Sequence, residues 1–465
     1  MNKKITFALF FANRGFFPGE VIADARREMI EAVTGAGFDY IAMDESLTRY
    51  GAVETIAEGK KYAEFLENNR GSFDGVIVCL PNFGDENGAT VALKGAGVPI
   101  LVQAYPDEIG KMDFARRRDA LCGKFAICNL LRQNNIPYTL TEKFVVSPSS
   151  EDFKFELQKF GAICRTVRGM KSFNIGAIGA RTTAFKTVRV DEMALAGKGI
   201  NVETIDLSEL FARVRNISDE KCAEMKEKIL SITNFSGYPE KKLDMMAKVQ
   251  AAIESLVCDY DLDAVAIRCW NEFETELGIA PCTSLSLLND MGIAAACEVD
   301  VENAVMMRAL SLAADSASTL LDYNNNYGDS LDKAIMFHCG PVPASMCYGK
   351  GQVCEHLMFK KTYGEGSGVG VNKTQIKEGK ITFGSVKTEN GKVYSFVTEA
   401  EFTADEIEPE FFGSGKVVRK ENLNAVANYM ATEGYKHHVC VSFGCFKDVI
   451  AEALGKYLGF EVEIL

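Results

Sequence analysis

Short apolar segments alternate with amphipathic ones along the first third of the chain. Residues 5–11 and 75–80 are short and almost continuously apolar, which is typical of strands buried on both faces of a parallel sheet. Apolar residues recur at helical spacing over 22–36 and 53–69. Further strands are expected at 40–43 and 99–103, and a further helix at 89–97. Strands that alternate with helices predict a first α/β domain over residues 1–165.

The same alternation continues after residue 165. We expect strands at 173–178, 202–206, 263–268 and 294–297. Helices are expected at 207–214, 241–258 and 281–290. These elements predict a second α/β domain over residues 166–300, built on another parallel sheet.

The pattern changes in the last third, where apolar and polar residues alternate and glycine, lysine and threonine become frequent. Residues 381–387 and 392–398 predict a β-hairpin, because Asn390-Gly391 between them is a sequence typical of a tight hairpin turn. A helix at 447–458 and a strand at 460–465 are expected to end the chain. The predicted fold class is therefore α/β: two Rossmann-like parallel-sheet domains followed by a β-rich, barrel-like C-terminal domain over residues 301–465.

Composition and charge narrow the class of protein. The chain has 465 residues, more than one hydrophobic core usually serves, so several domains are expected. A net charge of −13 argues against partners such as nucleic acid or an anionic membrane surface. No apolar run is long enough to span a bilayer, and the apolar start is broken by Asn13, Arg14 and Gly15, unlike a signal peptide. We therefore expect a cytoplasmic protein, whose 14 cysteines, none spaced as C-x-x-C, are buried reduced thiols.

Acidic residues follow two of the expected buried strands. Trp270, Glu272, Glu274 and Glu276 come just after the strand at 263–268, and Glu298 and Asp300 follow the strand at 294–297. The carboxyl ends of strands in an α/β sheet are where ligands bind. These residues are therefore candidates for a site, and a solvated loop is the alternative for the first group.

The four histidines all lie in the last third of the chain. His437-His438 precedes an expected strand, so the two rings should point to opposite faces and one at most should reach a given site. His338 ends another expected strand and precedes Cys339-Gly340-Pro341, a turn that would expose its ring to a pocket. A structural histidine is the alternative for each. Carboxylates with an imidazole suit Mn²⁺ or another divalent cation.

Several of these runs together resemble the L-fucose isomerase-like family, within the L-fucose/L-arabinose isomerase superfamily. The resemblance is carried by Cys269-Trp270, by residues 277–282, 287–293 and 296–300, by His338-Cys339-Gly340 and by His437-His438 before a strand. It implies a homo-oligomeric aldose–ketose isomerase whose Mn²⁺-type ion is held by a glutamate, an aspartate and a histidine.

Carried over by position, the resemblance implies Asp300 and His438 as metal ligands. Glu276, which precedes Asp300 by 24 residues, is the expected glutamate, with Glu272 and Glu274 as competitors. Glu276 and Asp300 are also the expected catalytic carboxylates. Residues expected to contact the sugar are Arg14, Trp270, Glu272, Glu298, His338 and His437. Arg14 also lies with Phe16 and Phe17 in a loop that we expect at a subunit interface near a neighbour's site.

The chemistry of such a site is consistent with these residue types. Moving a carbonyl from C1 to C2 requires a proton to leave C2 and return to C1, which a carboxylate can carry out as base and then as acid. A cation would stabilise the negative charge of the enediol(ate) intermediate. A non-catalytic sugar-binding or regulatory protein and a metal-assisted epimerase or aldolase are the alternatives. The sugar, whether a neutral deoxyhexose, a pentose or an anionic, sulfonated hexose, is left open.

Overall fold

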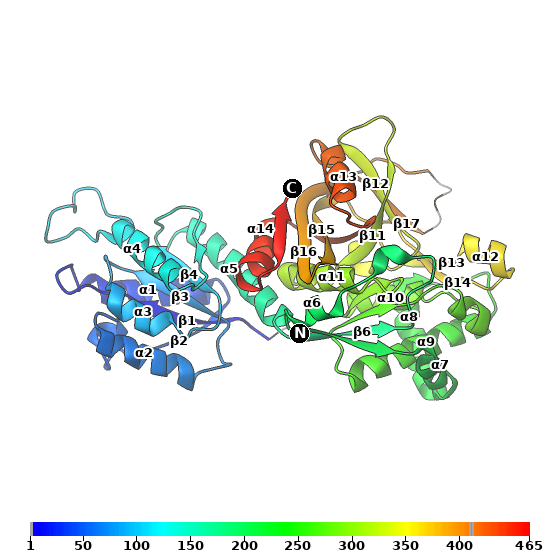
Figure 1. Ribbon diagram of the computed structural model, residues 1–465, viewed down its shortest axis with the longest axis horizontal. Coiled ribbons are helices and arrows are strands. Elements are labelled where there is room, and N and C mark those ends of the chain that lie inside the picture. The colour runs from blue at the N-terminus through cyan, green and yellow to red at the C-terminus, as the bar shows by residue number, and fades with distance from the viewer. Residues whose placement is uncertain (1–2, 409–410, 412) are drawn as a thin grey trace. The chain divides into compact units, whose positions relative to one another are not determined.

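The computed structural model describes residues 3–408, 411 and 413–465, and the chain divides into two compact units at Arg168 and Gly169 (Figure 1). Within these described residues, no helix combines the length and the apolar character needed to cross a membrane.

The first unit is built on a parallel sheet whose strands pair in the order β2-β1-β3-β4-β5. Its strands are β1 (Thr6–Phe11), β2 (Asp39–Ala42), β3 (Gly75–Leu80), β4 (Ile100–Ala104) and β5 (Thr139–Leu140). Its helices are α1 (Val21–Gly35), the short turn η1 (Arg49–Gly51), α2 (Ile56–Asn68), α3 (Glu86–Leu93), α4 (Ala120–Gln133) and α5 (Glu151–Met170).

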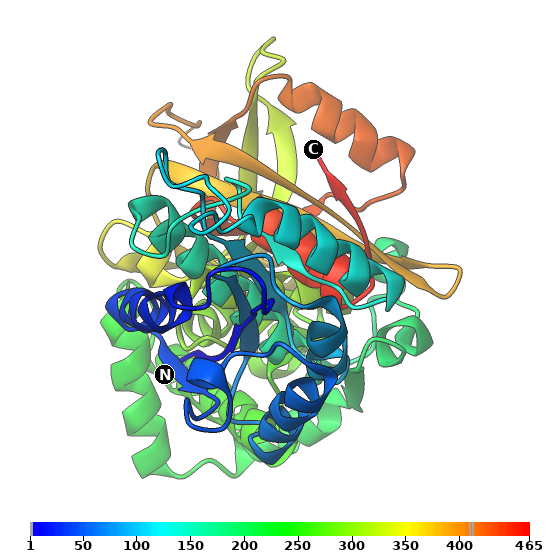
Figure 2. The ribbon, with the colours of Figure 1, turned by 90° about the vertical axis from the view of Figure 1, so that its left-hand side faces the viewer.

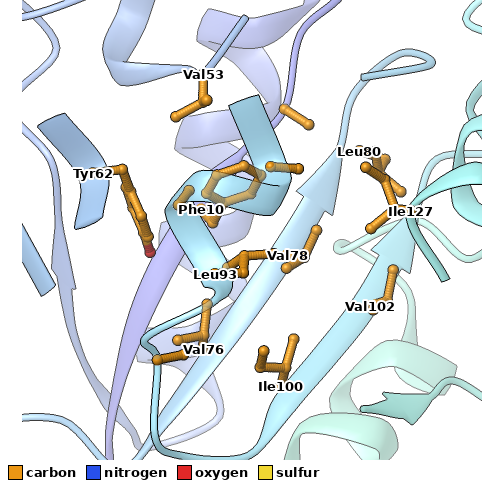
Figure 3. Close-up of a cluster of buried hydrophobic side chains, with 14 of the residues drawn as sticks. Phe10, Val53, Tyr62, Val76, Val78, Leu80, Leu93, Ile100, Val102 and Ile127 are labelled. Carbon is orange, nitrogen blue, oxygen red and sulfur yellow. The ribbon is translucent and has the colours of Figure 1, made fainter. Parts of the chain in front are cut away.

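Both faces of this sheet are covered, which explains why its strands read as continuous apolar runs. Ala8 and Phe10 of β1 lie in one buried cluster, whereas Phe7 and Leu9 lie in another. Figure 3 shows the first cluster, in which Phe10 meets Tyr62 edge to face at 5.0 Å between ring centroids. A strand that buries alternate residues on opposite faces needs apolar residues at every position.

The second unit begins with another parallel sheet, in the order β10-β9-β6-β7. Its strands are β6 (Phe173–Ile178), β7 (Ile200–Ile205), β9 (Ala264–Ile267) and β10 (Ala294–Cys297). The accompanying helices are η2 (Lys186–Val188), α6 (Glu192–Ala196), α7 (Leu207–Arg215), α8 (Asp219–Ile232), α9 (Glu240–Asp259), the π-helical turn η3 (Phe273–Leu277), α10 (Cys282–Asp290) and α11 (Val301–Ala314).

The C-terminal strands close into a barrel. Neighbouring strands pair in the order β15-β18-β11-β12-β17-β16, and a further pairing of β15 with β16 completes the ring, with β19 added beside β16. Their bounds are β11 (Thr319–Asn326), β12 (Lys333–His338), β15 (Gly379–Glu389), β16 (Lys392–Phe402), β17 (Ser414–Arg419), β18 (His438–Phe443) and β19 (Glu461–Ile464). In Figure 2, β15 and β16 form the long orange hairpin.

The remaining elements are a small sheet and the helices around the barrel. The sheet order is β14-β13-β8, from β8 (Thr233–Asn234), β13 (Gly351–Glu355) and β14 (Val369–Lys373). The helices are η4 (Ala344–Met346), α12 (Leu357–Tyr363), α13 (Leu423–Thr432), α14 (Lys447–Ile450) and the π-helical η5 (Ala451–Tyr457).

The structure confirms the predicted fold class of parallel-sheet domains followed by a β-rich, barrel-like domain. The predicted hairpin is also present, with φ of 52° at Asn390 and 75° at Gly391 in its turn. Both values lie in the left-handed region that a tight hairpin turn requires. The domain boundaries at residues 165 and 300 stay predictions. Helix α11 packs against β10 of the parallel sheet and also against β15 and β18 of the barrel, so it joins these two parts of the second unit.

Candidate active site

The acidic residues after β10 lie in a strained turn at the edge of the parallel sheet. Ile267 and Cys297 are paired at the carboxyl ends of β9 and β10. Directly after Cys297, Glu298 and Val299 both adopt left-handed backbone conformations, with φ of 63° and 59°. This conformation is unfavourable for a β-branched residue such as valine, and strain of this kind persists where the surrounding structure enforces it.

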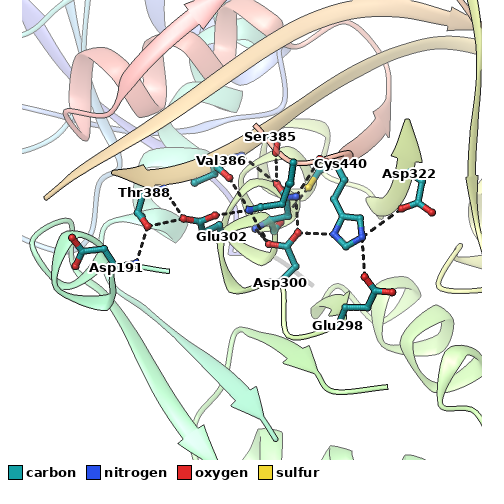
Figure 4. Close-up of polar contacts among 12 residues, drawn as sticks. Asp191, Glu298, Asp300, Glu302, Asp322, Ser385, Val386, Thr388 and Cys440 are labelled. Carbon is teal, nitrogen blue, oxygen red and sulfur yellow. Dashed lines mark hydrogen bonds and ion pairs between the residues drawn. The ribbon is translucent and has the colours of Figure 1, made fainter. Parts of the chain in front are cut away.

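Asp300 follows this turn and begins helix α11. Its Oδ1 accepts a hydrogen bond from the backbone N–H of Asn303 at 3.1 Å, which is the normal arrangement of an N-cap. Helix α11 therefore fixes the C-terminal end of the turn. The Glu298 side chain is directed toward the barrel strands (Figure 4).

His438, the first residue of β18, lies between carboxylates from both parts of the unit. Its Nδ1 is 2.8 Å from Asp300 Oδ2, and its Nε2 is 3.1 Å from Glu298 Oε2. Asp322 of β11 is paired with His438 on the neighbouring strand β18, and its Oδ1 is 3.4 Å from the same Nε2. Burial disfavours the charged imidazole, but Asp300 and Glu298 together raise the pKa of His438 to about 10.

A buried lysine, Lys436, forms ion pairs with two acids behind this histidine. Lys436 Nζ is 3.1 Å from Asp300 Oδ1 and 2.5 Å from Glu302 Oε2, and it also donates to the carbonyl oxygen of Val386. Glu302 in turn accepts hydrogen bonds from the backbone N–H and the hydroxyl of Thr388. Burial raises the pKa of the Asp300 carboxyl, but Lys436 and His438 more than reverse this effect and hold it well below its ordinary value.

His338 approaches the same place from the end of β12. The rings of His338 and His438 have centroids 5.9 Å apart, and these two residues and Asp322 offer donor atoms within 4.8 Å of one another. Nδ1 of His338 accepts a hydrogen bond from the backbone N–H of Cys339 at 2.9 Å. In the neutral ring the proton must therefore lie on Nε2.

Among the three competing glutamates after β9, Glu274 is the buried one. Burial raises the pKa of Glu274 to about 8, with a smaller contribution from Cys339, and Glu274 in turn contributes to the raised pKa of Cys269. Glu276 is exposed, and Glu272 is paired with Arg268 at 2.6 Å. Glu274 precedes Glu298 by 24 residues, the same spacing as between Glu276 and Asp300. This equal spacing is the signal that would have pointed to Glu274 and Glu298 as an alternative pair.

A pocket opens in front of these groups. Its described lining includes Trp270, Glu298, Asp322, His338 and His356, with Cys269, Cys282 and Cys339. No lysine or arginine is part of this described lining. The Trp270 ring is 5.5 Å from the ring of Phe185, which also lies 5.7 Å from the His438 ring. Sequence reasoning missed Asp322 and Phe185, since neither stands in a recognisable motif.

Two further residues predicted to bind substrate are His437, which lies at the rim of this cluster, and Arg14, which belongs to the first unit. His437 is exposed, and its Nε2 is 3.6 Å from Asp322 Oδ1. Arg14 belongs to the first unit, where it donates to Gly84 O and Glu86, each at 2.8 Å, and its guanidinium lies over the Phe83 ring. The roles predicted for both residues stay predictions.

Two stretches of the chain match known domain families. Residues 8–171 match the N-terminal domain of fucose/sulfoquinovose isomerases, and residues 336–465 match the C-terminal domain of L-fucose isomerase. A sulfoquinovose isomerase of Alkalicoccus urumqiensis is 26% identical over 282 residues, which is 59% of this chain and 61% of that protein. One of Priestia aryabhattai is 21% identical over 462 residues, 97% of each chain. One of a Clostridium species is 24% identical over 369 residues, 75% of this chain and 76% of that one.

We expect replacement of Lys436 by methionine to destabilise the second unit by about 3 kcal/mol, because it leaves Asp300 and Glu302 buried without their cation. Trp270, the single tryptophan of the chain, lies in this unit, so its fluorescence during denaturant unfolding measures the effect. The matched control is Lys392→Met, which breaks an exposed pair with Glu461 and should change stability little. Equal unfolding midpoints for the two variants would contradict the importance of the buried lysine.

Proposed function

The chain belongs to the L-fucose isomerase-like family, and we propose that it is a metal-dependent aldose–ketose isomerase acting on a sugar or sugar derivative. One observation carries this proposal. Nε2 of His438, Nε2 of His338, Oε2 of Glu298 and Oδ1 of Asp322 are buried, and within the described residues none makes a hydrogen bond of normal geometry. Glu298, Asp322 and His338 line the pocket, and His438 lies directly behind Glu298 and Asp322. Buried polar atoms normally have partners, so a group of them at one pocket calls for a ligand.

The donor atoms fit a divalent cation such as Mn²⁺. Nδ1–H of His438 donates a hydrogen bond to Asp300, which fixes the direction of the ring and leaves Nε2 as the nitrogen that would bind the ion. Because the pKa of His438 is raised to about 10, the ion would bind in place of the Nε2 proton. Glu298 and Asp322 offer carboxylate oxygens beside this nitrogen. We propose Glu298, Asp322 and His438 as the residues that would hold the ion, with Asp300 positioning His438. When bound, the ion would supply positive charge beside the two adjacent sugar oxygens on which negative charge develops.

His338 is less suited to hold the ion. Its Nδ1 is used as an acceptor, so the neutral ring presents an N–H at Nε2. We propose that this N–H donates to a hydroxyl group of the sugar, while the Trp270 ring packs against the apolar face of the sugar. His338 and Trp270 therefore keep the substrate-binding roles predicted for them.

We propose Glu274 as the carboxyl group that carries the proton between C2 and C1. A pKa of about 8 leaves both the acid and the base form populated near neutral pH, as a group that first takes and then returns a proton requires. Its burial next to the pocket thiols distinguishes Glu274 from Glu276, whose side chain is in solvent. This proposal differs from the roles predicted for Glu276 and Asp300, which stay the alternative until variants are measured.

The relatives named sulfoquinovose isomerase make a sulfonated hexose the first substrate to test. The lining described above carries acids and histidines, so a cation for a sulfonate group would have to come from elsewhere. A neutral deoxyhexose would need no such cation. The sulfonated hexose therefore requires a lysine or arginine from outside the described lining, whereas the neutral deoxyhexose does not.

We also propose a homo-oligomer and a cytoplasmic location. The first unit exposes Phe16, Ile109 and Phe114 to 70%, 99% and 85%, and contact with a second copy would remove these apolar side chains from water. Light scattering of the full-length protein measures the assembly, and a strict monomer contradicts it. The 14 cysteines are all free thiols, as is usual in the cytoplasm.

We expect the purified protein with Mn²⁺ to convert an aldose into its 2-ketose, and chelation to abolish the conversion. The assay compares sulfoquinovose, L-fucose and an aldopentose, with product identity determined by NMR. Tight binding of a sugar without conversion would favour a non-catalytic sugar-binding protein. An epimer or a cleavage product would favour an epimerase or an aldolase instead.

Replacement of Glu298 by glutamine should remove most of the bound Mn²⁺, because it takes away one carboxylate oxygen beside His438. Asp300→Asn, which acts through His438, should lower the affinity by about 10–100-fold. Glu276→Gln is the matched control and should keep its metal. Metal content after dialysis, measured by elemental analysis, decides between the two ligand sets. Loss of metal from the Glu276 variant with full retention in the Glu298 variant would restore the set predicted by position.

Replacement of Glu274 by glutamine should lower kcat by about 10²–10⁴-fold, because the proton carrier is lost. Mn²⁺ content should be unchanged, which separates this effect from loss of the ion. A variant that retains the kcat of the unmodified protein would rule out Glu274 as the proton carrier.

A further inference from the structure

Four cysteine side chains from distant segments form a continuous row beside the pocket. Cys269 follows β9, Cys297 ends β10, Cys282 begins α10 and Cys339 follows β12. The Sγ atoms of Cys269 and Cys297 are 3.0 Å apart, and those of Cys282 and Cys339 are 3.5 Å apart. Cys297 and Cys339 also offer sulfur atoms within 4.8 Å of each other and of a His338 nitrogen. The order along the row is therefore Cys269, Cys297, Cys339, Cys282.

The row is accessible from the pocket. Cys269, Cys282 and Cys339 are part of the pocket lining, and Cys339 is only half-buried. A small reagent that enters the pocket therefore meets a thiol with a second thiol in contact behind it. Cys258 differs from these residues because it lies exposed on α9, and the described part of the chain places no thiol in contact with it.

We propose that this row is a site of reversible thiol oxidation, at which a peroxide joins Cys282 and Cys339 in a disulfide. The Cys339 thiolate attacks a peroxide oxygen, the O–O bond breaks, and a sulfenic acid and one water molecule result. Sγ of Cys282 then attacks this sulfur, the S–O bond breaks, and a second water molecule leaves as the S–S bond forms. Two thiols lose two electrons and two protons in total, and hydrogen peroxide is reduced to two water molecules.

The other two thiols provide a path for the disulfide. Cys297 is next to Cys339 and in contact with Cys269, so its thiolate can attack the new disulfide at Cys339 and release Cys282. Cys269 can then attack in the same way and take over the bond to Cys297. Thiol–disulfide exchange of this kind neither adds nor removes electrons, so a Cys269–Cys297 disulfide is an equally oxidised product.

Oxidation of this row acts on the site in front of it, a consequence that rests on the proposed function. A disulfide bond is about 2.05 Å long, so the sulfur atoms of Cys282 and Cys339 must approach each other by about 1.5 Å. The backbone N–H of Cys339 donates a hydrogen bond to Nδ1 of His338. Cys297 directly precedes the strained residue Glu298. Movement of Cys339 therefore displaces the His338 side chain, and movement of Cys297 displaces that of Glu298.

The chemistry is tested by peptide mapping of the full-length protein. Protein freed of reductant is treated with hydrogen peroxide, its remaining thiols are alkylated, and a non-reducing digest is analysed by mass spectrometry. We expect a cross-linked peptide pair containing Cys282 and Cys339, or the exchanged pair of Cys269 and Cys297, that disappears with dithiothreitol. Cys258→Ala, the control, keeps these cross-links. Oxidation confined to cysteines outside the row overturns the proposal.

The effect on the site is tested by activity, expressed relative to the reduced form of each protein. Peroxide should lower the isomerisation rate several-fold, and dithiothreitol should restore it. The double variant Cys269→Ala/Cys339→Ala, which removes one thiol of each contacting pair, should resist peroxide, whereas Cys258→Ala should respond like the unmodified protein. Cross-links without loss of activity overturn the regulatory part of the proposal. If the reduced protein isomerises no sugar, the proposed function fails, and the peptide map alone decides the thiol chemistry.

Discussion

The hydrogen bond between Asp300 and His438 joins the two parts of the second unit on which the site depends. Asp300 begins the helix that follows the parallel sheet, and His438 begins a strand of the barrel. Both side chains are fully buried, so neither charge could persist there alone. Lys436 completes the arrangement because its single positive charge lies between the carboxylates of Asp300 and Glu302. The direction of the His438 ring, and with it the position of Nε2, follows from this buried network.

The strained turn at Glu298 and Val299 depends on the same network. Two successive left-handed residues without glycine are unfavourable, and such a turn would relax if its ends were free. One end is fixed by the pairing of β10 with β9, and the other by the N-cap of α11. The turn directs the Glu298 carboxylate to the side of His438 opposite Asp300. The strain thus accompanies a geometry that places acids on both nitrogens of one imidazole.

Much of the fold could be predicted from sequence because the apolar pattern of each strand indicates which of its faces are buried. The runs at β1, β3 and β9, and the Asn390-Gly391 turn, show this directly. Choosing among the carboxylates was a harder problem. Glu274 and Glu276 lie two residues apart in a π-helical turn, and only the fold decides which of them is buried. Asp322 lies beside His438 because the neighbouring strands β11 and β18 pair in that register, which the spacing of the two residues along the chain does not predict.

The contacts among the cysteines also could not be predicted from the sequence. The sequence predicted buried, reduced thiols without C-x-x-C spacing, and nothing in that pattern indicated that four of them lie together. Cys269 and Cys297 meet because β9 and β10 are neighbours, and Cys282 and Cys339 meet because α10 packs close to the end of β12. These are also the elements that carry or flank Glu298 and His338. The sheet edge that brings the carboxylates together therefore brings the thiols together as well.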